Sequence, residues 1–133
     1  MSIKIEISVG ELLDKITILQ IKTERIGDAA KLENIKKELR ILQAQWEGSP
    51  YSKIDLGENI SALKKVNEML WDIEDEIRNK ENKHVFDEGF IELARSVYFI
   101  NDQRAEIKRT INNSTGSDLI EEKSYSDYSS DKI

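Results

Sequence analysis

The sequence predicts an all-α protein: an antiparallel bundle of about four helices with a short N-terminal strand and a flexible acidic C-terminal tail. Four segments place apolar residues three or four positions apart, which is the spacing of one face of an α-helix. Most of these segments begin at a residue that caps helices and end at a glycine. The chain has 133 residues, the length of one domain. We therefore expect a single helical domain over residues 1–128 and a disordered tail over residues 129–133.

The N-terminal segment alternates apolar and charged residues. Ile3, Ile5 and Ile7 are interleaved with Lys4 and Glu6. An alternation with a period of two residues is typical of a strand with one buried face. The segment is therefore predicted to be a short strand, which requires a partner strand.

Two helices are expected on either side of Gly27. The sequence Ser8-Val9-Gly10-Glu11 is a capping box, in which the Ser8 and Glu11 side chains satisfy each other's backbone amides. The helix that begins there is apolar on two faces, which predicts a central helix or one shared with a partner. A second helix follows Asp28, and its apolar residues form one stripe, as expected of an outer helix. The stripe consists of Leu32, Ile35, Leu39, Leu42 and Trp46.

Two longer helices follow the break at Gly48-Ser49-Pro50. The sequence Asp55-Leu56-Gly57-Glu58 is a second capping box and predicts a helix that continues through Ile77. A fourth helix follows the capping residue Asp87 and ends at Gly116.

The segment after Gly116 is acidic and rich in serine. Leu119 and Ile120 could anchor a short turn or strand against the N-terminal segment. We expect residues 119–125 to dock on the helices, whereas residues 129–133 cannot bury enough apolar surface to offset the entropy lost on ordering.

Composition excludes several classes of protein. The net charge of −6 and the lack of a basic stripe argue against binding of nucleic acid or of an anionic membrane. The chain has no cysteine, which excludes disulfides and thiolate chemistry. No apolar run approaches the length of a membrane span. These features predict a cytoplasmic protein.

Several polar residues occupy positions where a helical protein would place its core. They come from three helices and would meet in one interior: Gln20, Asn67, Glu74, Asn101, Arg104 and Lys108. A buried arginine needs a partner, and Glu74 is the best candidate in the sequence for Arg104. Two interpretations remain open: a structural network that sets the helix register, or a pocket in which Arg104 and Lys108 bind a small anionic ligand.

A second group of residues is acidic. Glu11 and Asp14 lie near the start of the first helix, and Asp72 and Asp75 lie on the third. Carboxylates three positions apart can bind Mg²⁺ or Mn²⁺. This spacing resembles that of the all-α nucleotide pyrophosphohydrolases, although Asp72 and Asp75 face away from the apolar stripe of their helix. The charged interior also has a weak similarity to the helical chorismate mutases, but no arginine lies near the start of the first helix.

The order of motifs carries a more specific resemblance. The segments SVGELLDKITILQIKTERI, VNEMLWDIEDEIR, ELARSVYFINDQRAEIKRTIN and EEKSYSDY resemble a small helical family, the domain of unknown function six-one-six-five. The resemblance covers nearly the whole chain up to Tyr128. Some members of this family sit beside glycosyltransferase or tetratricopeptide segments, which implies a role in surface-glycan biosynthesis.

The sequence therefore predicts an intracellular binding or assembly module without a cofactor. The family resemblance implies that this module is accessory to surface-glycan biosynthesis. Its expected partners are a second copy or another protein, together with a small anionic ligand. The alternative is a Mg²⁺- or Mn²⁺-dependent enzyme acting on a phosphorylated small molecule or nucleotide.

Overall fold

The protein is all-helical, as predicted. The computed structural model describes residues 1–128, which contain helices α1 (Val9–Arg25), α2 (Ala29–Glu47), α3 (Gly57–Asn82) and α4 (Glu88–Thr115). A short 3-10 helix, η1 (Pro50–Lys53), connects α2 to α3. Within the described part of the chain, no helix is long and apolar enough to cross a membrane.

Local hydrogen bonds explain where most helices begin. The side chain of Ser8 accepts a hydrogen bond from the Glu11 amide at the start of α1, and Asp28 does the same for α2. Asp87 caps α4 by accepting from the Phe90 amide over 3.0 Å. The second capping box differs from the prediction. Leu56 is the N-cap residue of α3 and has no side-chain cap, while Asp55 accepts from the Gly57 amide.

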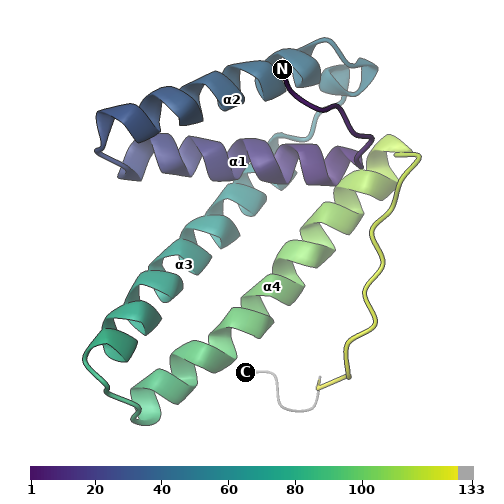
Figure 1. The fold of residues 1–133 in the computed structure, drawn as a ribbon. Helices are drawn as coiled ribbons and strands as arrows, with labels where there is room; N and C mark the ends of the chain where they lie inside the picture. The colour runs from purple at the N-terminus through teal and green to yellow at the C-terminus, as the bar shows by residue number, and fades with distance from the viewer. Residues whose placement is uncertain (129–133) are drawn as a thin grey trace.

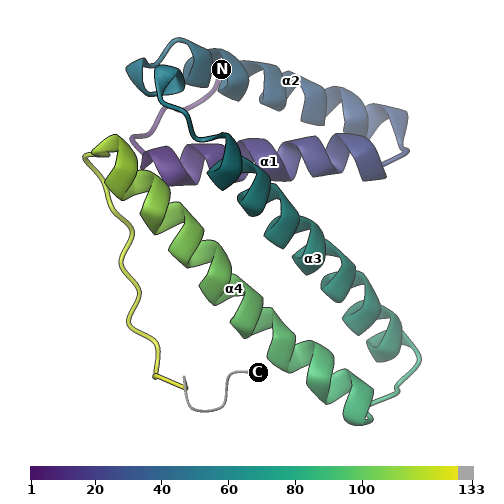
Figure 2. The ribbon, with the colours of Figure 1, turned by 180° about the vertical axis from the view of Figure 1, so that it is seen from behind.

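The four helices form two antiparallel hairpins that meet at α1 (Figures 1 and 2). One hairpin is α1 with α2, and the other is α3 with α4. Helix α1 packs against all three other helices, whereas α2 packs mainly against α1 and η1. The central position predicted for the first helix and the outer position predicted for the second are therefore confirmed. The bundle is open, because the far ends of α3 and α4 extend beyond the first hairpin (Figure 1).

The core lies where α1 crosses the α3–α4 hairpin. Its members are buried apolar side chains from three helices and the residue before α3: Val9, Leu13, Ile16, Leu56, Leu63, Val66, Ile100 and Ile111. Helix α2 has no fully buried residue, although Leu39, Leu42 and Trp46 pack partly against this core. The burial of α1 on several sides explains why its apolar residues occupy two faces.

The prediction of an N-terminal strand is wrong for the single chain that the structure describes. Residues 1–7 form neither helix nor strand, and no strand is present within residues 1–128. Ile3 and Ile5 are 91% and 73% exposed. A strand forms only when its backbone groups pair with a neighbouring strand, and the described chain supplies none.

The segment after α4 docks on the helices mainly through polar contacts. It leaves Gly116, which has a φ of 66°, and runs beside α4 as an extended chain (Figure 1). The Ser117 hydroxyl accepts from the Val9 amide, and Tyr128 donates to Asp102 and packs on the ring of Phe99. Within residues 119–125, where docking is expected, the contacts with α4 are ion pairs of Glu121 with Lys108 and of Glu122 with Arg109, whereas Leu119 and Ile120 remain nearly half exposed. The predicted disorder of residues 129–133 lies outside the described residues.

Candidate functional site

A buried carboxylate lies at the point where α1, α3 and α4 meet. Asp14 is 1% exposed. The Arg104 guanidinium approaches it side-on: Nε donates to Asp14 Oδ1 over 2.9 Å and Nη2 donates to Oδ2. The Asn67 side-chain amide donates to the same Oδ1 over 2.9 Å and to the Thr17 hydroxyl over 3.0 Å. Asp14 is thus the centre of a network that joins three helices.

The location of Asp14 follows from the helical repeat of α1. Gly10, Asp14, Thr17 and Ile21 follow one another at helical spacing, and all four are buried. Gly10 and Thr17 are small, and they allow the other helices to approach this face of α1 closely. Asp14 Oδ1 accepts from both Arg104 and Asn67, which meets the usual requirement that a buried charge be paired and hydrogen-bonded.

A second ion pair extends the network towards the start of α1. Lys108 is 6% exposed and its ammonium group lies 2.6 Å from Glu11 Oε2, 3.6 Å from Glu121 Oε2 and 4.0 Å from Asp14 Oδ2. The hydrogen bond with Asp14 raises the pKa of Arg104. Burial acts to raise the pKa of Glu11, but the hydrogen bond and charge of Lys108 outweigh it, so this pKa lies below its ordinary value.

The lowered pKa of Glu11 predicts acid sensitivity. A carboxylate with a lowered folded-state pKa contributes stability above its unfolded pKa, and this contribution is lost as the pH falls through the folded value. At pH 7 the wild type should therefore be more stable than Glu11→Gln, and the difference in melting temperature should shrink between about pH 5 and pH 3. Glu33→Gln on the exposed face of α2 is the control and should show no such change. A difference for Glu11→Gln that stays constant over this range would contradict the role assigned to Glu11.

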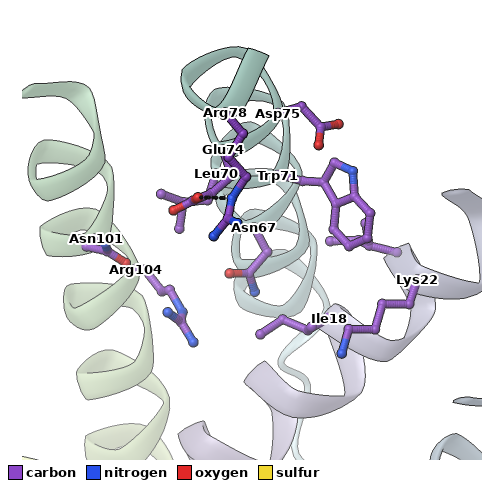
Figure 3. Close-up of a pocket in the computed structure, with 11 residues that line it drawn as sticks. Ile18, Lys22, Asn67, Leu70, Trp71, Glu74, Asp75, Arg78, Asn101 and Arg104 are labelled. Carbon is purple, nitrogen blue, oxygen red and sulfur yellow. Dashed lines mark hydrogen bonds and ion pairs between the residues drawn. The ribbon is translucent and has the colours of Figure 1, made fainter. Parts of the chain in front are cut away.

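An open cleft of about 500 Å³ lies beside the Asp14 network, between α1, α3 and α4 (Figure 3). Its apolar wall comes from α1 and α3, and its polar groups come from all three helices. The lining residues are Ile18, Ile21, Lys22, Asn67, Leu70, Trp71, Glu74, Asp75, Arg78, Asn101 and Arg104. The volume falls within the range of pockets that hold small molecules.

Several polar groups in this cleft have no partner within residues 1–128. Arg104 uses Nε and Nη2 for Asp14 and keeps Nη1 uncommitted. Lys22 forms no ion pair with the described residues, and the Asn101 side chain forms no hydrogen bond with them. Asp75 is exposed at the rim and is also without an ion-pair partner there. The cleft therefore offers two cationic donors, an amide and a carboxylate to a bound molecule.

The cleft contains four of the six residues predicted from the sequence to bind a ligand. Asn67, Glu74, Asn101 and Arg104 line it. Lys108 instead lines a smaller hollow of about 220 Å³, to which Asn101 and Arg104 also contribute. Gln20 is half-buried and lines neither hollow.

The predicted pairing of Glu74 with Arg104 is wrong. Glu74 bonds to Arg78 on the next turn of its own helix, 3.1 Å away, and its side chain is 49% exposed. The partner of Arg104 is Asp14, a residue that the sequence predicted only as a potential metal ligand. The helical spacing of Asp14 with Gly10 and Thr17 was the signal for its burial, and Lys22 and Trp71 had no signal that linked them to the cleft.

Three of the four acidic residues proposed as metal ligands form ion pairs, and the fourth, Asp75, is exposed at the rim of the cleft. Glu11 and Asp14 contact Lys108 and Arg104, while Asp72 contacts Arg25 on the exposed side of α3. No group of three or more acidic, histidine or cysteine side chains within residues 1–128 is placed to hold a metal ion. The Mg²⁺- or Mn²⁺-dependent enzyme stays a prediction from the sequence.

Comparison with known proteins identifies one family. The family described as "Family of unknown function (DUF6165)" matches residues 3–132, which is almost the entire chain. No curated protein and no solved structure matches the chain.

Proposed function

We propose that the chain, which belongs to the Family of unknown function (DUF6165), is a binding module that takes a small anionic ligand in the cleft between α1, α3 and α4. The observation that carries this proposal is the arrangement of Arg104. Its guanidinium is held in place by Asp14, and its remaining nitrogen, Nη1, stays available beside an open cleft.

The Asp14 network prepares Arg104 for binding. A free arginine loses side-chain entropy when it orders around a ligand, whereas Arg104 is already ordered by two hydrogen bonds to a buried carboxylate. Asp14 neutralises much of its charge, so a second cation strengthens attraction to an anion. Lys22 on the α1 side of the cleft supplies that cation (Figure 3).

The other lining groups indicate which kind of anion fits. Ile18, Leu70 and Trp71 form an apolar wall, and Asn101 and Asp75 offer hydrogen-bond partners for hydroxyl groups. This combination suits a molecule with one anionic group and a hydroxylated body, such as a sugar phosphate. A module of this kind is compatible with an accessory role in surface-glycan biosynthesis.

Ligand-dependent stabilisation tests the proposal. A ligand that binds the folded state raises the melting temperature by mass action. Glucose phosphate is expected to raise it more than inorganic phosphate or succinate, and uncharged glucose should leave it unchanged. An absence of stabilisation by all three anions would contradict the proposal.

Lys22→Gln tests the site without disturbing the buried network. Loss of one charge-assisted hydrogen bond should weaken glucose phosphate binding by about tenfold or more, measured by calorimetric titration. The matched control is Lys37→Gln on α2, which removes the same charge at an exposed position away from the cleft. Equal weakening by both variants would indicate general attraction to positive charge and would exclude the cleft as the site.

A further inference from the structure

The N-terminal segment leaves two isoleucine side chains exposed and its backbone groups without hydrogen-bond partners. Residues 3–7 form neither helix nor strand, and none of their backbone groups takes part in a hydrogen bond within residues 1–128. Ile3 and Ile5 are largely exposed. A segment of alternating sequence whose backbone groups are unpaired can form a strand by pairing with another chain.

The sequence of this segment is complementary to itself in one antiparallel register. When two copies pair about Ile5, that residue lies opposite Ile5 of the second copy, and Ile3 lies opposite Ile7. Lys4 then lies opposite Glu6 of the second copy, and Glu6 lies opposite Lys4. Residues directly opposite one another in an antiparallel pair share a face and interact. One face of the pair would be entirely isoleucine, and the other would carry two ion pairs.

We infer that residues 3–7 form an antiparallel strand pair with the same residues of a second copy, related by a two-fold axis through Ile5. Such an interface is isologous, because each copy contributes the same patch. The pairing accounts for the strand pattern that the isolated chain leaves unused. The inference is independent of the proposed ligand.

The structure also provides a surface on which the isoleucine face can pack. A groove of about 440 Å³ lies between the N-terminal segment and the segment after α4, lined by Ile5, Ile7, Leu119 and Ile120 among others. Leu119 and Ile120 are 46% and 43% exposed. A two-stranded ribbon alone is only marginally stable in water and needs an apolar surface against one face. Leu119 and Ile120, which line this groove from the segment after α4, offer this surface in each copy.

Charge complementarity selects a second copy as the partner. The segment of the same chain that lies nearest, around Leu119 and Ile120, forms no hydrogen bond with residues 3–7. Self-pairing matches both charges of the strand with opposite charges, whereas like charges directly opposite one another are unfavourable. The interface is small, so the association should be weak and dependent on concentration.

Charge exchange on the strand tests this register. Lys4→Glu leaves two acidic side chains on the polar face of each strand, and Glu6→Lys leaves two basic ones, so each variant alone should repel its own copies. Both positions are exposed, and folding of the helical domain should be unaffected. An equimolar mixture of the two variants restores opposite charges across the pair and should form a mixed dimer. The double variant Lys4→Glu/Glu6→Lys should self-associate as the wild type does.

Sedimentation equilibrium of the full chain, at concentrations from about 1 µM to about 1 mM, provides the measurement. We expect a monomer–dimer equilibrium for the wild type, at least tenfold weaker association for each single exchange, and recovery in the mixture. Ile5→Ser should weaken the association as well, because Ile5 lies opposite itself at the centre of the pair. A wild type that stays monomeric throughout would overturn the inference and leave a different protein as the strand's partner. A dimer that withstands both single exchanges, or a mixture that does not recover, would overturn the register.

Discussion

Replacing Arg104 with methionine is expected to destabilise the protein by about 3 to 5 kcal/mol, the loss typical when one partner of a buried ion pair is removed. Asp14 is only 1% exposed and would keep a charge inside the protein. Asn67 would still donate a hydrogen bond to Asp14. The Lys108 ammonium lies 4.0 Å from Asp14 Oδ2 but already forms a closer ion pair with Glu11. Denaturant unfolding measures the loss. Combining Arg104→Met with Asp14→Leu removes both charges and should recover much of the stability.

A double-mutant cycle separates the two candidate partners of Arg104. Alanine substitutions at Asp14 and Arg104 should show a coupling of about 1 to 3 kcal/mol. The control cycle pairs Arg104 with Glu74, which lines the same cleft but bonds to Arg78. Its coupling should be close to zero. A larger coupling with Glu74 than with Asp14 would show that the network is assigned to the wrong helix.

Replacing Gly10 with alanine should also destabilise the protein, by about 1 to 3 kcal/mol or more. Alanine normally favours a helix over glycine by up to about 1 kcal/mol. Here the added Cβ atom would lie 2.6 Å from the Lys108 carbonyl oxygen and 3.0 Å from Asn112 Oδ1. The Lys108 oxygen belongs to the α4 backbone, so relief of the clash requires the two helices to separate. Separation would also lengthen the hydrogen bond from the Gly10 amide to Asn112, now 2.7 Å.

Gly27→Ala is the matched control for this prediction. No atom lies within 4 Å of a Cβ atom added at Gly27, which connects α1 to α2. The substitution should be neutral or slightly stabilising, because it reduces the entropy of the unfolded chain. Chemical denaturation of both variants provides the comparison. If Gly10→Ala were as stable as Gly27→Ala, α1 and α4 could not be in close contact at this point.

The positions of the helices could be predicted from the sequence because the forces that set them are local. A cap such as Ser8 or Asp87 acts on an amide three residues away, and apolar spacing reports the buried face of its own helix. The polar interior could be predicted in part for the same reason, since Asn67 and Arg104 interrupt apolar faces. Periodicity gives the direction in which a side chain points but does not identify the helix that lies opposite.

The sequence by itself determined four helices, their approximate ends and the central position of α1. Only the tertiary structure decided that Arg104 meets Asp14 and not Glu74, because both acids are within reach of an arginine until the crossing of α1 over the α3–α4 hairpin is known. It also decided that the alternating segment Ile3–Ile7 finds no partner strand within residues 1–128. The physical reason is the same in both cases. A cap or an apolar stripe is completed within a few residues, whereas an ion pair or a strand pair requires a second element whose position depends on the packing of the whole molecule.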